Sequence, residues 1–255
     1  MAVDVGNTQT VLGLFDGREP LGQWRIATEA HRTADELAVF FAGLLALEGL
    51  RLEEVDAVIV SSVVPGLTRS YRNLASEVFG VPFYGVTPSM KTGLDNRYDD
   101  PEAVGADRIV NAVAAGRHYG FPAIIVDIGT ATTVEAVDGA GCYLGGAILT
   151  GLYVSLEALV SRTAKLPSVD LEEEPPRVIA TNTPDSIRSG FIYGYAGAVD
   201  ALIRRSRDEL AQGDGVKVVA TGGPAGVIVP YCREIDEFDP DLTLNGLRIL
   251  YEMNS

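Results

Sequence analysis

The chain has 255 residues, 47% of them hydrophobic, and its 20 basic and 35 acidic side chains leave a formal net charge of −15. This charge repels polyphosphate backbones and anionic membrane surfaces, so we expect neither nucleic acid nor a membrane as a partner. No signal-peptide pattern opens the chain, the longest apolar run, 37–47, is too short for a bilayer, and Cys142 and Cys232 lack metal-ligand spacing. We therefore expect a cytoplasmic protein, and the length suits two lobes of roughly 120 residues.

The first half of the chain predicts three strands in a meander, followed by alternating helices and strands. Strands are expected at residues 2–5, 10–15, 21–28, 57–61 and 82–86. Helices are expected at about 33–47, 65–79 and 100–118. Thr33 and Glu36 have the spacing of a capping box, and Asp100 followed by Pro101 is typical of a helix start.

The second half repeats this plan. Strands are expected at residues 123–128, 132–137, 143–148 and 217–221, and helices at about 152–164, 183–211 and 243–252. We place the boundary at 118/119, which gives an N-terminal lobe of residues 1–118 and a C-terminal lobe of residues 119–255. A meander followed by mixed helices and strands, present twice, predicts an α/β fold with duplicated lobes.

A nine-residue phrase supports the duplication. Val3-Asp4-Val5-Gly6-Asn7-Thr8-Gln9-Thr10-Val11 returns 123 residues later as Val126-Asp127-Ile128-Gly129-Thr130-Ala131-Thr132-Thr133-Val134, with five of nine positions identical. Each copy predicts a hairpin with an aspartate at its tip, a glycine in the turn and hydroxyl groups beyond it. Such hairpins suit nucleotide phosphates and their cations, although buried hairpins with capping aspartates are the simpler alternative. The repetition favours the first interpretation.

Other segments add candidate chemistry. The three lysines follow no glycine-rich loop, so a Walker-type phosphate loop is excluded. Asp107 beside Arg108 is either a general base with a carboxylate-binding partner or a surface pair in a mildly unfavourable helix. Thr221-Gly222-Gly223 ends a strand where the backbone has room to lie against a base or ribose, a weak signal on its own. Glycines at 190, 194 and 197 form one face of the long helix, which predicts either close packing within the chain or a subunit interface.

The motifs together resemble the superfamily of acetate and sugar kinases, heat-shock chaperones and actin, and within it the type III pantothenate kinases over nearly the whole chain. The matching segments are residues 4–11, Gly105-Ala106-Asp107-Arg108, residues 127–133, Gly145-Gly146-Ala147-Ile148, Asn182-Thr183 and residues 239–248. The resemblance implies two actin-like (ribonuclease H-like) lobes with a nucleotide cleft between them. It also implies ATP-dependent phosphorylation of pantothenate, the first step of coenzyme A synthesis.

The resemblance further implies a role for each matching residue. ATP would be bound by Asp4, Val5, Gly6, Asn7, Thr8, Gln9, Thr10, Val11 and Thr130, with Asp4 holding the Mg²⁺ shell. Asp127 would bind a monovalent cation, K⁺ or NH₄⁺, and Asp107 would be the general base. The pantothenate pocket would be lined by Tyr98, Gly105, Ala106, Asp107 and Arg108 and completed by Thr183, in this family from across a homodimer interface.

The chain departs from the family pattern in three places. Leu149-Thr150 replaces Ala-Pro, Thr181 replaces a common lysine, and Val134-Glu135 replaces Phe-Asp. None of these touches the base or the two cation aspartates, so we expect altered affinity rather than lost chemistry.

Two other functions stay open. A sugar or carboxylic acid kinase of the same superfamily is the nearer one, although a sugar kinase would ordinarily carry Gly-Gly-Thr where this chain has Gly6-Asn7-Thr8. A non-catalytic nucleotide-binding regulatory factor is the other, but the Asp107-Arg108 pair has no evident purpose there.

Overall fold

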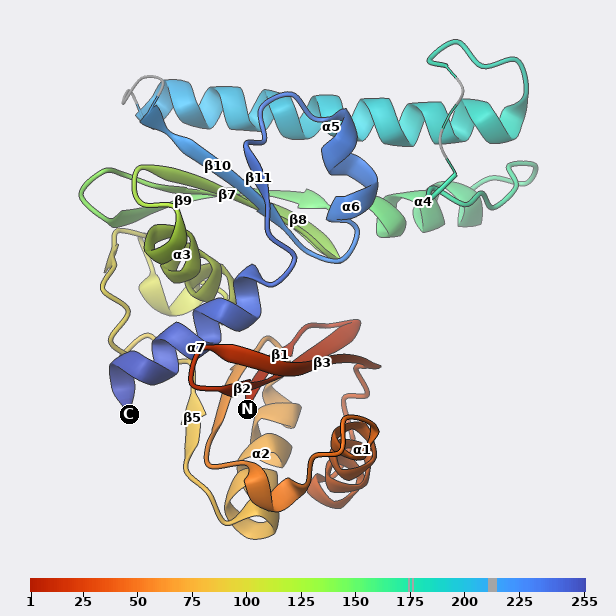
Figure 1. Cartoon of the computed structure of the whole chain (residues 1–255). Coiled ribbons are helices and arrows are strands. Elements are labelled where there is room, and N and C mark those ends of the chain that lie inside the picture. The colour runs from red at the N-terminus through yellow and green to blue at the C-terminus, as the bar shows by residue number, and fades with distance from the viewer. Residues whose placement is uncertain (174, 176, 211–214) are drawn as a thin grey trace. The chain divides into compact units, whose positions relative to one another are not determined.

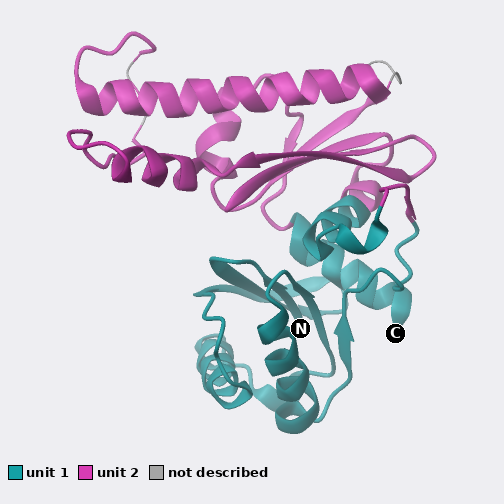
Figure 2. Cartoon of the chain, turned by 180° about the vertical axis from the view of Figure 1, so that it is seen from behind, with its two compact units in different colours: residues 1–93, 100–114, 242–255 teal, residues 94–99, 115–241 magenta. Residues whose placement is uncertain are grey.

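The structure is a computed structural model that describes residues 1–173, 175, 177–210 and 215–255 (Figure 1). Its residue contacts group the chain into two compact units (Figure 2). Unit 1 comprises residues 1–93, 100–114 and 242–255, and unit 2 comprises residues 94–99 and 115–241. Compared with lobes of residues 1–118 and 119–255, the segments 94–99, 115–118 and 242–255 are grouped with the other half.

Unit 1 is built on a five-stranded mixed sheet in the order β3-β2-β1-β4-β5. The strands are β1 (Ala2–Val5), β2 (Gln9–Asp16), β3 (Glu19–Ala27), β4 (Val58–Ser62) and β5 (Phe83–Gly85). The first three are antiparallel neighbours, as expected of a meander, and β4 and β5 are parallel to β1. The helices are α1 (Ala34–Leu47), α2 (Pro65–Asn73), which continues as a π-helix at Leu74–Phe79, and α7 (Leu242–Asn254).

Unit 2 repeats this sheet. Its order is β11-β10-β7-β8-β9-β6, so the series β9-β8-β7-β10-β11 matches the series of unit 1 strand for strand. The strands are β6 (Asp95–Asn96), β7 (Ala123–Ile128), β8 (Ala131–Val137), β9 (Cys142–Thr150), β10 (Lys217–Thr221) and β11 (Glu237–Phe238). The helices are α4 (Leu152–Ser161), α5 (Thr183–Leu210) and α6 (Ala225–Ile228). The predicted α/β fold with two mixed sheets, each containing an antiparallel meander flanked by helices, is confirmed.

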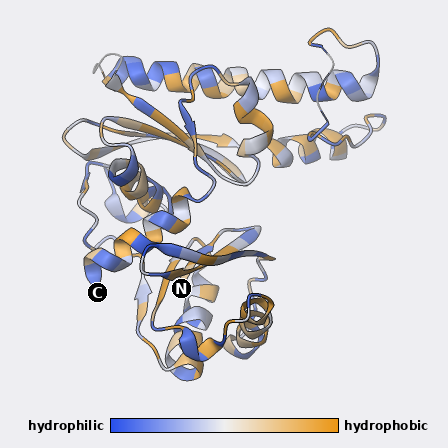
Figure 3. Cartoon of the chain, in the orientation of Figure 1, coloured by the Kyte–Doolittle hydropathy of each residue, from blue (hydrophilic) through white to orange (hydrophobic). Residues whose placement is uncertain are grey.

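Each sheet buries one face against its own helices. In unit 1, Val3 and Val5 pack with α1 and α2, and in unit 2, Val126 and Ile128 pack with α4 and α5. Val218 and Ala220 of β10 belong to the same core as Val126 and Ile128, and Figure 3 shows β10 coloured largely as hydrophobic. Because side chains alternate along a strand, the aspartate between each pair faces the opposite side of its sheet. The duplicated sequence therefore places its two carboxylates at equivalent positions.

The two hairpins differ by one residue in their turns. In the first, Val5 pairs with Thr10, whereas in the second, Ile128 pairs with Thr132. Accordingly, the Gly6 amide donates to Gln9 O at 3.0 Å, but the Gly129 amide donates to Ala131 O, two residues on, at 3.0 Å. A gapless match of the two sequence copies is therefore correct up to the glycine and shifted by one position beyond it.

One predicted helix is wrong in part. The expected helix at 100–118 is divided into a short 3₁₀ turn at Pro101–Ala103 and α3 (Ala106–His118), because the intervening Val104 is extended. Asp100 still caps the first turn, accepting from the Glu102 amide at 3.2 Å. Asp107 consequently lies in the first turn of α3, where a negative side chain is favourable, and not in the second turn of one helix that begins at Asp100.

The other expected bounds lie within three residues of the observed ones, and the capping box at Thr33 and Glu36 is present. The sequence prediction missed α6 and the two-residue strands β6 and β11. The expected end of the long helix at residue 211 falls outside the described residues, which show α5 through Leu210. None of the described helices combines the length and hydropathy that crossing a membrane requires.

Candidate functional site

The first aspartate hairpin is held closed by its own backbone. A Cβ on Gly6 would lie 2.9 Å from Gln9 O, so the turn needs a residue without a side chain. The neighbouring Thr10 is buried, and its hydroxyl lies 2.9 Å from the hydroxyl of Thr28. The Thr28 amide also donates to Thr8 O at 2.9 Å. The start of β2 and the end of β3 thus fix the turn that carries Asn7.

Ser61 is a candidate that the sequence reasoning missed. In the parallel pairing of β1 with β4, Ser61 stands directly beside Asp4. Val58 and Val60 pack into the core with α1 and α2, so Ser61 and Asp4 share the opposite face of the sheet. The Ser61 hydroxyl is buried and has no hydrogen-bond partner among the described residues. A buried hydroxyl without a partner costs free energy, which makes this position a candidate for contact with bound ligand or ion.

The second aspartate hairpin is enclosed by two glycines from neighbouring segments. Gly222, at φ 98°, follows β10, and a Cβ there would lie 2.2 Å from Ile128 O and 2.7 Å from Asp127 Oδ1. Gly151 follows β9, its amide donates to Thr130 O at 3.1 Å, and a Cβ there would lie 2.3 Å from the same oxygen. The predicted Thr-Gly-Gly segment therefore lies directly against the Asp127 tip.

Asp107 is placed by its neighbours on both sides. Its Oδ1 accepts from the Arg108 amide at 2.8 Å, and a Cβ on Gly105 would lie only 2.5 Å from that oxygen. Gly105 thus allows the Asp107 carboxylate to take this position, because a side chain at residue 105 would displace it. Arg108 is 8% exposed, a low value for an arginine, whose burial normally requires polar partners. In the next turn, Asn111 Oδ1 accepts from the Thr243 hydroxyl at 2.7 Å, which ties α3 to α7.

Tyr98 lies against the glycine pair of β9. A Cβ on Gly145 would be 3.0 Å from its ring, and Gly145 has φ 105°, which favours glycine. The Tyr98 ring is also 6.5 Å from that of Tyr143, whose hydroxyl donates to the buried carboxylate of Glu135. Glu135, which departs from the family pattern, therefore contacts Tyr143, and Tyr143 in turn contacts the predicted pantothenate residue Tyr98.

Thr183 is the first residue of α5, and a set of contacts orders this end of the helix. Asn182 caps it, accepting from the Asp185 amide at 2.9 Å. Arg188 forms ion pairs with Asp185 and Glu173 and donates from Nε to Asp170 O at 2.9 Å. Asp170 and Glu173 are thereby held against the helix turn that presents the exposed Thr183.

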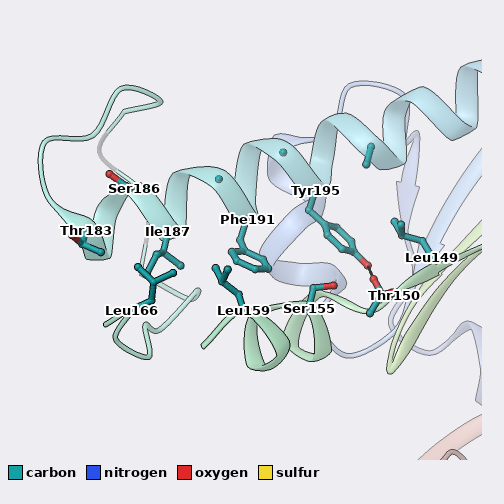
Figure 4. Close-up of a pocket in the computed structure, with 13 residues that line it drawn as sticks. Leu149, Thr150, Ser155, Leu159, Leu166, Thr183, Ser186, Ile187, Phe191 and Tyr195 are labelled. Atoms are coloured by element: carbon teal, nitrogen blue, oxygen red, sulfur yellow. Dashed lines mark hydrogen bonds between the residues drawn. The ribbon is translucent and has the colours of Figure 1, made fainter. Parts of the chain in front are cut away.

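A largely apolar groove of about 580 Å³ runs beside α5 within unit 2 (Figure 4). Ile187, Phe191 and Tyr195 of α5 line it together with Ser155 and Leu159 of α4. Thr183 lies at one end, and Thr150 and Leu149 lie at the other. Of the predicted site residues, the groove includes Thr183 only.

The glycine stripe of α5 opens outward. Cβ atoms built on Gly190, Gly194 and Gly197 would meet nothing within 4 Å among the described atoms, and all three glycines are exposed. Close packing of another part of this chain against the stripe is therefore wrong for the described residues. The subunit interface stays as the interpretation of the stripe.

The predicted site residues divide between the two units. Unit 1 holds residues 4–11 and 105–108, and unit 2 holds Tyr98, Asp127, Thr130 and Thr183. Within unit 2, Asp127 and Thr130 belong to one hairpin, whereas Tyr98 contacts β9 and Thr183 begins α5. Among the described residues, no group of three or more His, Cys, Asp or Glu side chains is arranged to hold a metal. Mg²⁺ needs no such group, since it is usually bound by one or two carboxylates together with substrate phosphates.

Comparison with known proteins identifies relatives along the whole chain. The family model of the type III pantothenate kinases matches residues 1–205. A type III pantothenate kinase of Rubrobacter xylanophilus is 66% identical over 100% of this chain and 98% of its own, and one of Streptomyces avermitilis is 47% identical with the same coverage. Among solved structures, a putative Baf family transcriptional activator from Campylobacter jejuni has a TM-score of 0.62 at 18% identity, covering 98% of this chain and 96% of its own. A putative 2-dehydro-3-deoxygalactonokinase from Sinorhizobium meliloti has a TM-score of 0.55 at 13% identity, covering 98% and 95%. These two similarities show the fold alone.

Proposed function

The chain belongs to the type III pantothenate kinase family, and on that premise we propose how its own residues carry out the reaction. The activity is ATP-dependent phosphorylation of pantothenate to 4′-phosphopantothenate, which begins coenzyme A synthesis. The proposal concerns the base, the nucleotide and cation residues, the acceptor pocket and the assembly.

Asp107 is the general base. As the primary hydroxyl oxygen of pantothenate attacks the terminal phosphorus of ATP in line, the hydroxyl proton passes to the Asp107 carboxylate and the bond to the ADP oxygen breaks. The observation that carries this assignment is the close fit of Gly105 and the Arg108 amide around Oδ1, which holds one carboxylate oxygen in place. A carboxylate fixed in this way suits positioning, from which phosphoryl transfer obtains much of its rate.

The two hairpins have different roles: the first binds ATP and Mg²⁺, and the second binds a monovalent cation and contributes Thr130 to the ATP site. Residues 4–11 and Thr130 bind ATP through turn amides and hydroxyls. Asp4, with the buried Ser61 hydroxyl beside it, provides oxygen donors that suit the water shell of Mg²⁺. Mg²⁺, when bound, would neutralise charge on the phosphates. At the other hairpin, the Asp127 carboxylate and Ile128 O lie against Gly222, an oxygen-rich position that suits K⁺ or NH₄⁺.

Pantothenate is bound by Tyr98 and by residues 105–108, with Arg108 as the partner for its carboxylate. Thr183 completes the pocket of the partner subunit in a homodimer. This assembly is supported by the outward-facing glycines of α5, by the apolar groove beside them and by the exposed Thr183 at the end of that groove. A row of glycines lets two helices approach closely, and burying the apolar surface of the groove would stabilise the dimer. The two lobes, residues 1–118 and 119–255, and a cytoplasmic location complete the proposal.

An ADP-release assay with pantothenate, sugars and other alcohols tests the reaction, and Asp107→Asn tests the base. We expect turnover with pantothenate that needs Mg²⁺ and rises with K⁺, and we expect Asp107→Asn to lose most activity while keeping its fold. Asp99→Asn, an exposed carboxylate eight residues earlier, is the matched control and should retain activity. Turnover with a sugar but not with pantothenate would contradict the substrate, and near-normal turnover of Asp107→Asn would remove it as the base.

Light scattering tests the assembly. The wild type should be a dimer, and Gly194→Leu should be a folded monomer, because a side chain at position 194 meets nothing in its own chain. Gly43→Leu, also on an exposed helix glycine with nothing within 4 Å, should remain a dimer. A monomeric wild type, or a dimeric Gly194→Leu, would contradict the interface.

A further inference from the structure

A buried tyrosine of α5 contacts the start of β8, the second strand of the second hairpin, and the end of the neighbouring strand β9. The Tyr195 Oη lies 2.7 Å from Thr132 Oγ1 on β8 and 2.8 Å from Thr150 O at the end of β9. Tyr195 is 8% exposed and Thr132 is fully buried. Figure 4 shows Tyr195 extending from α5 towards Thr150. No role implied by the family resemblance involves Tyr195.

The Tyr195 hydroxyl has a single proton, so it can donate only one of these two hydrogen bonds. A carbonyl oxygen only accepts, so the Tyr195 hydroxyl donates to Thr150 O, and the Thr132 hydroxyl donates in turn to Tyr195 Oη. Burial raises the pKa of Tyr195, which keeps its hydroxyl protonated as a donor. The result is a directed chain of two hydrogen bonds that joins β8, α5 and β9. Removing the tyrosine hydroxyl would leave a buried donor without its acceptor.

The chain of bonds continues to the turn that carries Thr130. Thr150 is followed by Gly151, whose amide donates to Thr130 O at 3.1 Å. The Gly151 backbone is in such close contact that a Cβ there would lie 2.2 Å from Gly129 O. A shift of the end of β9 therefore moves Gly151, which contacts the turn that carries Thr130. Tyr195 fixes that end of β9 from the side of α5.

We propose that Tyr195 is a positioning residue for the nucleotide, which holds the Thr130 turn in its ATP-binding geometry through Thr132 and Thr150. The proposal rests on the proposed function for the assignment of Thr130 to ATP. Tyr195 does not touch the substrate in this scheme. It acts through the two strand ends, and its effect falls on ATP rather than on pantothenate.

The test compares Tyr195→Phe with Tyr193→Phe in the full-length protein. Tyr193 is two residues away on the same helix, and its ring packs edge-on against Tyr231 at 5.5 Å, so its variant also loses one tyrosine hydroxyl from α5. ATP binding is measured by calorimetry without an acceptor, and the KM values for ATP and pantothenate are measured separately. For Tyr195→Phe we expect ATP affinity to fall about tenfold, as for the loss of buried hydrogen bonds, with the KM for pantothenate within about twofold of wild type. Tyr193→Phe should resemble wild type in all three.

Variants of Thr132 separate positioning from packing. Thr132→Ser keeps the hydroxyl and should retain ATP affinity, whereas Thr132→Val removes one of the two bonds and should lower ATP affinity by less than Tyr195→Phe does. Because Tyr195→Phe already breaks both bonds, the double variant Tyr195→Phe/Thr132→Val should bind ATP no more weakly than Tyr195→Phe alone. Circular dichroism melts establish that each variant is folded at the assay temperature.

The outcomes distinguish this inference from the proposed function. Unchanged ATP affinity in Tyr195→Phe overturns the inference, and so does an equal rise of both KM values, which indicates general loosening. If the wild type binds ATP but phosphorylates another alcohol, the substrate assignment fails while the calorimetric comparison still decides the role of Tyr195. A wild type that does not bind ATP overturns both.

Discussion

Replacing Gly105 by alanine should separate the position of the catalytic base from the stability of the fold. The alanine Cβ would lie 2.5 Å from Asp107 Oδ1, whereas ordinary contacts begin near 3.4 Å, so the oxygen has to move by about 0.9 Å. The oxygen is at the end of a side chain, and the carboxylate can rotate without shifting the backbone. The substitution should therefore be absorbed by the carboxylate itself.

The size of the effect follows from this displacement. A misplacement of about 1 Å in a catalytic constellation can lower a rate by roughly 100-fold, so we expect kcat to fall between about 10- and 100-fold. The free energy of unfolding should stay within about 1 kcal/mol of wild type. The lost bond from the Arg108 amide costs about 1 kcal/mol, and the lower entropy of the unfolded chain offsets about 0.4–1 kcal/mol.

Steady-state kinetics with pantothenate and ATP, together with urea denaturation, measure the two quantities. Gly43→Ala is the control, since its Cβ would meet nothing within 4 Å in the interior of α1; its kcat should be unchanged and its stability higher by about 1 kcal/mol. If Gly105→Ala keeps kcat within twofold while Asp107→Asn is inactive, the positioning argument is refuted. If Gly105→Ala unfolds, the carboxylate does not absorb the added methyl group.

Three further substitutions address other contacts. Gly146→Ala should lower the free energy of unfolding by about 3 kcal/mol in urea denaturation, because its Cβ would lie 1.9 Å from the backbone oxygen of Val134; an unchanged midpoint would contradict this. Ser61→Ala should raise stability by about 1–2 kcal/mol, since it removes a buried hydroxyl without a partner among the described residues, and a loss of stability would indicate a partner in the free protein. Arg188→Ala should raise the KM for pantothenate several-fold and leave the KM for ATP unchanged, because it removes the contacts of α5 with Asp170 and Glu173. Arg204 is on the same helix and pairs with Glu234, and Arg204→Ala should change neither KM.

Much of the fold was accessible from local sequence signals. The predicted bounds of β1, β7 and β10 agree with the structure, because each is a short, largely apolar run that is followed directly by a glycine. The small strands β6 and β11 were not accessible, since two residues carry no periodicity and their pairing depends on neighbours distant in the chain. The helix at 100–118 was predicted as continuous because its composition does not reveal the extended Val104.

The sequence predicted those residues of the candidate site whose role can be inferred from the residue type alone. Asp107 and the two hairpin aspartates stand out as carboxylates two residues from a glycine. The reason for Gly105 was hidden, because the steric contact that favours it depends on the orientation of a side chain two residues later. Ser61 and Tyr195 were missed for a similar reason: a serine in a buried strand and a tyrosine in a helix become notable only through partners that are absent or distant.

The one-residue difference between the two hairpin turns has an evolutionary consequence. Point substitutions can make the two copies more or less alike in sequence, but they cannot restore equal length. The first turn offers two residues, Asn7 and Thr8, within its closing hydrogen bond, and the second offers Thr130 alone. Once a duplicated ancestor had gained or lost that residue, neither turn was a substitute for the other. Each copy was then free to specialise, because the two turns close equivalent strand pairs, Val5 with Thr10 and Ile128 with Thr132, with different numbers of residues.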